Sequence, residues 1–271
     1  SKDTLWRDKR LGRFEQDEFG LLIIDECSGW VEDNSSWHNI VRYFNQAKVV
    51  GLDATPLRGD KKPLLFDSIA CEYPIWDAVN DGWLVEPIQQ YVMTSGFDMS
   101  QLRDQVGKDW TAGEVDRAWR KERPMQALAG QIVDWAVKEG NARRKNYILS
   151  TLVFNSSVEM ARDLADILNR RHARDGTGKA AVISSLDTDL QERRQILADF
   201  EAGEIKYLSN WGIATKGFDC PNIEMVVLSR KTKNHALMQQ MIGRGLRPLS
   251  ETAFKLNAAK DAKERKAHAA Q

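Results

Sequence analysis

Residues 237–248 of the chain read LMQQMIGRGLRP. In the first half of this stretch, apolar residues recur at helical spacing: Leu237, Met238, Met241 and Ile242. Asn234 precedes them at a position typical of a helix cap. Two glycines flank Arg244, and Arg247 follows one turn later, so the pattern predicts two guanidinium groups at the end of a buried helix. Arginine binds phosphate oxygens in a fork geometry and keeps its charge. The alternative is a helix that ends in two solvated arginines.

The segment before this helix alternates between apolar and helix-forming stretches. We predict buried strands at residues 151–154, 180–183, 205–208 and 225–228. Ser156 with Glu159 has the spacing of a capping box for the first intervening helix, and Thr188 with Gln191 has it for the second. Strands that alternate with helices predict a parallel, doubly wound sheet.

A second strand–helix–strand pattern occupies the start of the chain. Residues 21–24 (LLII) form an apolar run of the kind that is buried on both faces of a parallel sheet, and Asp25-Glu26 follows it. A short helix is predicted at residues 37–44 and another strand at 49–52, before the turn Asp53-Ala54-Thr55-Pro56. Carboxylates at the carboxyl end of a buried strand lie where open α/β sheets bind ligands. The alternative for Asp25-Glu26 alone is an acidic turn.

Composition sets limits on the class of protein. Lys+Arg and Asp+Glu number 39 each, so any binding of nucleic acid must use a local groove and not a global basic field. The three cysteines are widely separated, which fits a reducing compartment and offers no metal-ligand spacing. No apolar run is long enough to cross a membrane. We expect a cytoplasmic protein with no membrane partner.

Four segments stand in a fixed order: Asp25-Glu26, Asp53-Ala54-Thr55-Pro56, residues 215–221 (TKGFDCP), and Gln240-x-x-Gly243-Arg244-x-x-Arg247. With Leu152-Val153-Phe154 between them, they resemble motifs II to VI of the superfamily-two DEAD/DEAH-like helicases and translocases, of the bacterial or phage type. The resemblance covers roughly residues 14 to 250. It implies an α/β fold with two RecA-like parallel-sheet domains, ATP and magnesium between them, and single- or double-stranded nucleic acid, with DNA favoured, across both.

The resemblance also implies a role for each matching residue. Asp25 resembles the carboxylate that holds magnesium, and Glu26 resembles the base that orients the attacking water. The second domain would supply arginine fingers and a contact to the γ-phosphate: Arg244, Arg247 and Gln240. The remaining nucleotide contacts would come from Asp219, on the ribose, with Gly217 and Gly243. Coupling to nucleic acid would involve Thr55, Asp53, Thr215 and Phe154. Ser28 and Asp53 depart from the usual residues of motifs II and III, which affects this coupling and not the metal carboxylate.

The largest departure is the absence of G-x-x-x-x-G-K-[ST] from the 271 residues. Residues 176–179 (GTGK) resemble the end of this P-loop, but Ala173 and Ala180 stand where the motif needs Gly and Ser or Thr, so we interpret them as a surface turn. We therefore expect the first RecA-like domain to be truncated at its N-terminus, with one sheet face uncovered. A preceding motor segment, in the same or another chain, would carry the P-loop, and this chain alone would be inactive.

The predicted organisation has four parts. Residues 1–87 form the later part of the first RecA-like domain, 88–145 a linker with helices, 146–250 a complete second domain, and 251–271 a charged tail. The leading hypothesis is a nucleic-acid-dependent ATPase motor. The alternative is a non-catalytic helicase-like fragment that binds nucleic acid or a partner, whereas an unrelated α/β enzyme would require the four ordered motifs to be a coincidence.

Overall fold

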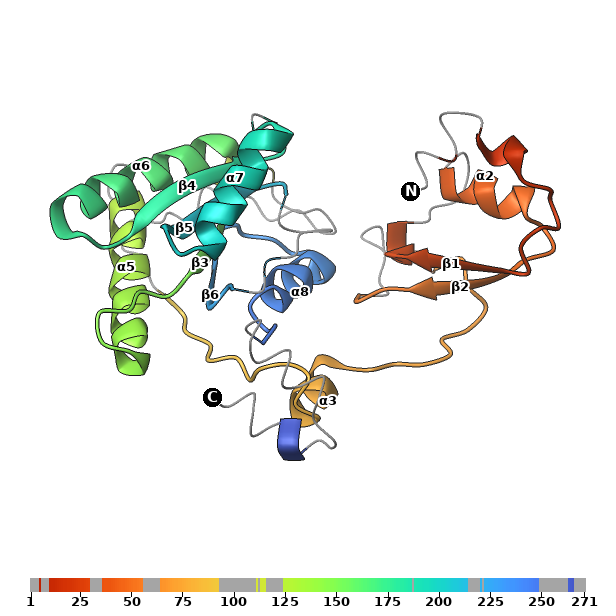
Figure 1. Ribbon diagram of the computed structural model, residues 1–271, viewed down its shortest axis with the longest axis horizontal. Helices are drawn as coiled ribbons and strands as arrows, with labels where there is room; N and C mark the ends of the chain where they lie inside the picture. Colours follow the sequence, from red (N-terminus) through yellow and green to blue (C-terminus); the bar gives the residue numbers. More distant parts are fainter. Residues whose placement is uncertain are drawn as a thin grey trace. The chain divides into compact units, whose positions relative to one another are not determined.

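The computed structural model describes residues 5, 10–29, 36–55, 64–92, 111, 113–115, 124–186, 188–213, 220, 222–248 and 263–265. The chain separates into two compact units, Ser1–Glu72 and Tyr73–Gln271, each with its own core (Figure 1). The predicted boundaries at residues 87, 145 and 250 remain predictions.

The first unit is a two-stranded parallel sheet with helices beside it. Its elements are η1 (Arg10–Arg13), β1 (Leu21–Asp25), η2 (Cys27–Gly29), α2 (Ser36–Tyr43) and β2 (Lys48–Leu52). The strands pair in parallel from Leu21↔Lys48 to Asp25↔Leu52, with α2 as the crossover between them. The predicted strand–helix–strand unit is therefore confirmed, and it places Asp25 and Asp53 at the same end of the sheet.

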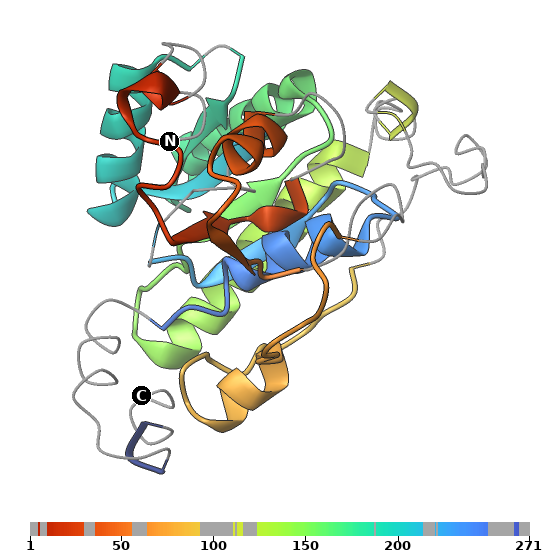
Figure 2. The same ribbon diagram turned by 90° about the vertical axis from the view of Figure 1, so that its right-hand side faces the viewer.

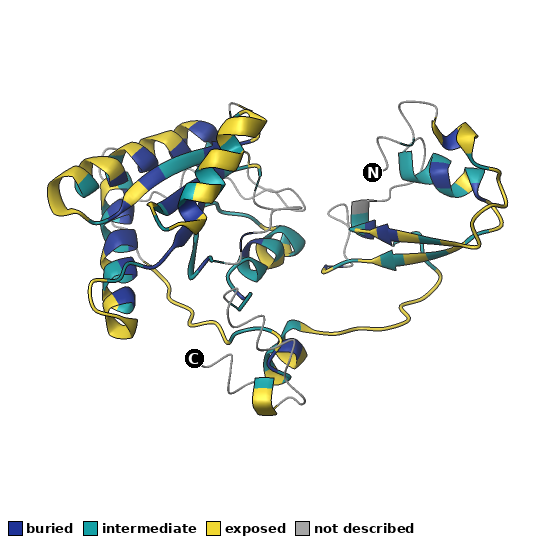
Figure 3. Cartoon of the chain, viewed as in Figure 1, coloured by how far each residue is buried: buried dark blue, intermediate teal, exposed yellow. Residues whose placement is uncertain are grey.

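The two faces of this small sheet differ in burial (Figure 3). On the inner face Ile24 is 1% exposed and lies in the core together with Cys27. On the outer face Leu21 and Ile23 are 51% and 62% exposed. The prediction that residues 21–24 are buried on both faces of the sheet is therefore wrong. One face of this sheet is uncovered.

The second unit contains the larger sheet. Its elements are α3 (Ile75–Asn80), α5 (Pro124–Arg143), β3 (Thr151–Phe154), α6 (Val158–Asp175), β4 (Lys179–Ser184), α7 (Leu190–Glu201), β5 (Ile205–Trp211), β6 (Met225–Leu228) and α8 (His235–Gly243). The strand order is β4-β5-β3-β6 and every pair is parallel. The predicted α/β class with parallel sheets is confirmed.

Helices cover both faces of this sheet (Figures 1 and 2). One core joins α5 and α6 to the strand residues Val153 and Tyr207. The other joins α7 and α8 to the alternate strand residues, among them Leu152 and Phe154. Successive strand residues point to opposite faces, so the continuous apolar run of β3 feeds both cores.

The helix caps show why these segments begin where they do. The Ser157 hydroxyl accepts the Met160 N–H at the start of α6, so the cap lies one residue after the predicted Ser156. At α7 the Asp189 carboxylate caps in place of the predicted Thr188. Thr188 instead accepts the Ser184 N–H and ties down the end of β4. No helix in the described part of the chain has the length and hydropathy needed to cross a membrane.

Candidate active site

Asp25 and Glu26 lie at the carboxyl end of β1, as the sequence predicts. Asp25 is exposed, and one of its oxygens accepts the N–H of Glu26 at 2.9 Å. Glu26 has φ of 51°, a left-handed conformation that is unusual for a residue with a side chain. The chain therefore turns sharply at Glu26, directly after the end of β1. Backbone strain of this kind is often found at functional sites.

Asp53 connects this turn to the turn after β2. Its two oxygens accept the Ser28 N–H and the Thr55 N–H, both at 2.8 Å. The Thr55 hydroxyl lies 3.4 Å from the same carboxylate, and Thr55 is 2% exposed. The two residues that depart from the family pattern, Ser28 and Asp53, thus contact each other. The structure joins the motif II and motif III turns through this pair.

The residue directly after the two carboxylates, Cys27, lies in a closely packed apolar core. It is 3% exposed, and a Cβ placed on Gly51 would come within 2.7 Å of its Sγ. Burial, followed by the negative charges of Asp53 and Asp25, raises the pKa of the Cys27 thiol. The thiol therefore stays neutral and acts as a small core residue.

The second unit positions the predicted arginines at the end of α8. The Asn234 side chain accepts the Leu237 N–H, which confirms the predicted cap, and Met241 anchors the helix in the core with no exposure. The helix ends at Gly243, and Arg244 follows in a right-handed conformation. Arg244 and Arg247 are both partly buried, as is Gln240 one turn earlier. All three lie on the segment that the sequence predicts.

The two glycines around Arg244 have different surroundings. A Cβ on Gly245 would lie 2.8 Å from the Val226 Cγ2, so β6 requires the absence of a side chain there. A Cβ on Gly243 would meet nothing within 4 Å. Packing thus explains Gly245, whereas the predicted nucleotide-binding role of Gly243 remains a prediction.

Buried polar residues gather at the carboxyl ends of β3, β5 and β6, and none of them was predicted to be a site residue. The Asn155 side-chain amide donates to the Ser209 hydroxyl at 3.0 Å and to the Asn210 carbonyl at 3.3 Å. The Ser229 hydroxyl donates to the Phe154 carbonyl at 2.8 Å. Buried polar groups need such partners, so this network fixes the loops at the edge where parallel sheets bind ligands. The signal in the sequence was a polar residue directly after each apolar run.

Other predicted site residues lie elsewhere. Phe154 is 2% exposed and packs in the core that contains Met241, so its ring faces inward. Thr215, Gly217 and Asp219 lie outside the described residues. Asp25, Glu26, Asp53 and Thr55 belong to one unit, whereas Gln240, Gly243, Arg244 and Arg247 belong to the other. In the described part of the chain, no group of three or more His, Cys, Asp and Glu residues is arranged to hold a metal ion.

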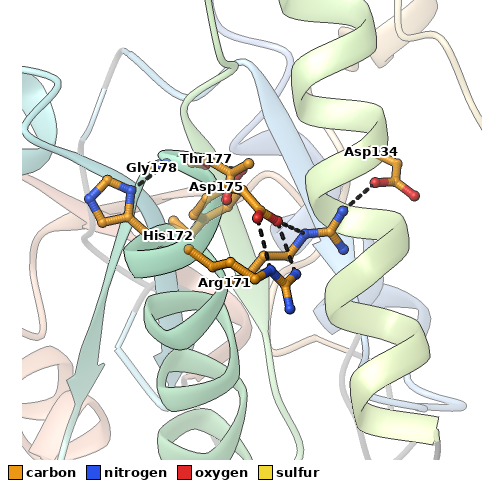
Figure 4. Close-up of polar contacts among 8 residues, drawn as sticks. Asp134, Arg171, His172, Asp175, Thr177 and Gly178 are labelled. Atoms are coloured by element: carbon orange, nitrogen blue, oxygen red, sulfur yellow. Dashed lines mark hydrogen bonds and ion pairs between the residues drawn. The ribbon is translucent and has the colours of Figure 1, made fainter.

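The GTGK segment is a structural turn (Figure 4). Gly176 ends α6 with φ of 66°, and the His172 Nδ1 accepts the Gly178 N–H at 2.9 Å. The buried Tyr207 hydroxyl donates to the Thr177 carbonyl at 2.8 Å. Arg171 joins Asp134 of α5 at 2.7 Å, which fastens α6 to α5. These contacts hold the turn between α6 and β4, as interpreted from the sequence.

Two family models match the chain. The helicase conserved C-terminal domain matches residues 135–248, and the type III restriction enzyme res subunit matches residues 2–58. The second match contains both carboxylate turns, and the first contains the larger sheet and α8.

Curated proteins with similar sequences are considerably longer than this chain. The putative ATP-dependent helicase IRC3 of Saccharomyces cerevisiae is 31% identical over 250 residues, which is 88% of this chain and 33% of that protein. A type I restriction enzyme EcoAI endonuclease subunit of Escherichia coli is 24% identical over 248 residues, 85% of this chain and 30% of that protein. The chain thus spans about a third of these relatives.

Solved structures share the fold. A fragment of a putative HsdR subunit of a type I restriction enzyme from Vibrio vulnificus has a TM-score of 0.57 at 22% identity, and the match covers 92% of this chain and 44% of that one. The type ISP restriction-modification enzyme LlaBIII, bound to DNA, has a TM-score of 0.51 at 14% identity, with 99% and 21% covered.

Proposed function

Because this chain belongs to the superfamily-two helicase type, we propose that it is part of an ATP-dependent motor that moves on DNA. The observation that carries this proposal is the clamp at the end of the first sheet, in which Asp53 ties the Asp25-Glu26 turn to Thr55. In such a motor a change at the phosphate must reach the nucleic acid. A hydrogen-bonded link between the two turns can carry it.

The carboxylates suit phosphoryl transfer. Asp25 fits a magnesium ion because it is an exposed carboxylate at the end of a parallel strand. It accepts one backbone N–H, which leaves lone pairs on its oxygens that can bind a metal. Bound magnesium would neutralise charge on the phosphates of ATP. Glu26, which follows Asp25 at the left-handed turn, would orient the attacking water.

The second unit would supply the positive charge. Arg244 and Arg247 follow a buried, capped helix, so their backbone is held while their side chains are only partly buried. Guanidinium groups at such a place can stabilise the charge that spreads over the transferred phosphoryl group. Gln240 would contact the γ-phosphate. Hydrolysis would then require residues from both units.

DNA is the favoured nucleic acid because the similar restriction enzymes include one whose structure is bound to DNA. The motor would grip the backbone and not read base sequence. The sequence contains no P-loop motif, so the main phosphate cradle would come from a preceding motor segment. We expect the chain alone to bind DNA and to hydrolyse ATP slowly or not at all.

The test combines DNA binding with ATP turnover. Fluorescence anisotropy should show binding of single- or double-stranded DNA that weakens as salt rises. Turnover is measured with and without DNA for the native chain, Glu26→Gln and the exposed control Asp17→Asn. DNA-stimulated turnover that Glu26→Gln abolishes and Asp17→Asn does not would support the motor. It would also refute the expectation that the isolated chain is inactive. If the native chain neither binds DNA nor hydrolyses ATP, the proposal is refuted.

A non-catalytic DNA-binding fragment is the alternative, and linkage between ligands separates it from a motor. For a motor part, a non-hydrolysable ATP analogue with magnesium should change the affinity for DNA, and Arg247→Ala should remove that change. DNA affinity that is indifferent to the analogue would favour the non-catalytic fragment.

A further inference from the structure

The segment that opens the second unit folds into a compact turn around α3, here called the α3 turn (residues 73–85). Gly82 has φ of 77°, which reverses the chain after the helix. The Trp83 N–H then donates to the Ala78 carbonyl at 2.8 Å. The Tyr73 hydroxyl closes the turn from the other side by donating to the Asp81 carboxylate at 2.8 Å. The turn therefore presents a defined surface.

This surface is acidic and aromatic. From residue 73 to 92 the sequence contains Asp77, Asp81 and Glu86 and no lysine or arginine. Tyr73 and Trp83 are 55% and 41% exposed on the same turn. An aromatic face beside carboxylates suits a planar cation, and arginine fits it better than lysine because its guanidinium can stack and donate at once.

The chain's own C-terminal segment provides this cation. The Arg265 Nε donates to the Asp81 carbonyl at 2.9 Å, across 184 residues of sequence. Its guanidinium carbon lies 4.4 Å from the centre of the Trp83 ring. Residues 263–265 accordingly lie beside α3 (Figure 1). Over residues 251–271 the sequence is basic overall, with Lys255, Lys260, Lys263, Arg265 and Lys266 against three acidic residues.

The α3 turn also contacts the end of α8. The Val85 N–H donates to the Leu246 carbonyl at 3.0 Å, and Leu246 is 3% exposed. Leu246 directly precedes Arg247, so this bond fixes the backbone on which the arginine stands. A contact on the α3 turn is thus connected to Arg247 through Val85 and Leu246.

We propose that the C-terminal segment docks on the α3 turn through Arg265 and so steadies the backbone that carries Arg247. When the segment docks, the Arg265 guanidinium leaves water and stacks on Trp83. This contact keeps the turn at Gly82 in its folded conformation. Val85 then keeps its N–H aligned with Leu246. This inference rests on contacts within the second unit and stands apart from the proposed ATPase activity.

Hydrogen exchange in the full-length chain tests the docking. Arg265→Ala should speed exchange of the Trp83 and Val85 amides by about fivefold or more. A partly buried cation–π contact stabilises the closed state enough to slow local opening by about that factor. Arg265→Lys should fall between, because it keeps the charge and loses the planar stack. The exposed neighbour Lys263 gives the matched control, and Lys263→Ala should leave both amides unchanged.

Three results would overturn the docking. The amides of residues 82–85 could exchange equally in Arg265→Ala and the native chain. Lys263→Ala could accelerate them as much as Arg265→Ala, which would indicate general charge and not docking. Exchange could also rise uniformly across α5 and α6, which would indicate a global effect in place of a local one.

Discussion

At the scale of single residues, Asp53 shows what a sequence can and cannot predict. Its position in the Asp53-Ala54-Thr55-Pro56 segment, which resembles motif III, marked it as a candidate coupling residue. Its partner Ser28 could not be foreseen, because the two are 25 residues apart and meet only when β1 and β2 pair. The same holds for Asn155 and Ser229, which are far apart in sequence and share a hydrogen bond of 3.1 Å. Motif residues were predictable, whereas the groups that hold them depend on tertiary pairing.

Replacing Asp53 with alanine should loosen both turns of the first unit. Two backbone N–H groups would lose their acceptor, which costs about 1–3 kcal/mol for buried or partly buried groups. Exchange of the Ser28 and Thr55 amides should accelerate together. Asp53→Asn should cost less because its amide oxygen still accepts one bond. Independent exchange of the two amides in Asp53→Ala would contradict a shared clamp.

At the scale of elements, the helices and strands followed the apolar pattern closely, and the differences have local causes. β5 continues through Ser209 and Asn210 to Trp211, beyond the predicted 205–208. The polar residues remain inside the sheet because they find partners there: the Ser209 hydroxyl donates to the Ala161 carbonyl at 2.8 Å. A strand predicted from a run of apolar residues ends at the first polar residue. Such a prediction does not include the hydrogen bonds that allow Ser209 to be buried. At α6 the cap was predicted at Ser156, whereas the adjacent Ser157 caps the helix.

Tyr147 joins three elements at the opposite edge of the larger sheet. It lies between α5 and β3, and its hydroxyl donates to the Glu224 carboxylate, just before β6, at 2.7 Å. The Ser150 N–H and Arg143 contact the same carboxylate, whose side chain is 4% exposed. Burial, and then the bond to Glu224, raise the pKa of Tyr147 to about 12. The protonated phenol is therefore part of the folded structure.

Tyr147→Phe should lower the stability of the second unit by about 1–3 kcal/mol at neutral pH, because a buried carboxylate loses a donor. The pKa of Tyr147 is higher in the folded chain than the value of about 10 in the unfolded chain. Its contribution is thus complete below about pH 10 and is lost as pH rises toward 12. Urea unfolding should show the native chain and the variant converging across this window. The exposed Tyr91→Phe serves as control, and a constant difference up to pH 12 would contradict the assignment.

At the scale of the whole molecule, the two units differ in how completely they bury their apolar surface. The larger sheet is covered on both faces by α5 with α6 and by α7 with α8. The smaller sheet leaves the side chains of Leu21, Ile23, Val50 and Leu52 more than a third exposed. The sequence predicted such a face from the strands that a RecA-like domain needs. It could not predict which residues would face outward, because a continuous apolar run carries no alternation.

The two faces of β1 allow a matched pair of substitutions. Ile23→Thr should reduce the binding of a hydrophobic fluorescent dye and leave stability nearly unchanged, because Ile23 is 62% exposed. Ile24→Thr should destabilise the first unit by about 2 kcal/mol or more, because Ile24 is 1% exposed and the hydroxyl would be buried. Thermal unfolding and dye fluorescence measure both effects. Equal destabilisation by the two variants would mean that the outer face is covered in solution.

The strand order of the larger sheet also governs events during protein synthesis. β3 occupies an inner position, and its partners Tyr207 of β5 and Met225 of β6 are translated long after Thr151. While the ribosome makes the intervening helices, this strand, which is fully buried in the folded unit, has neither neighbour. A nascent chain stopped before residue 225 would therefore expose the β3 edge to other nascent chains. The β6 side of β3 can therefore be covered only after residue 228 has been made.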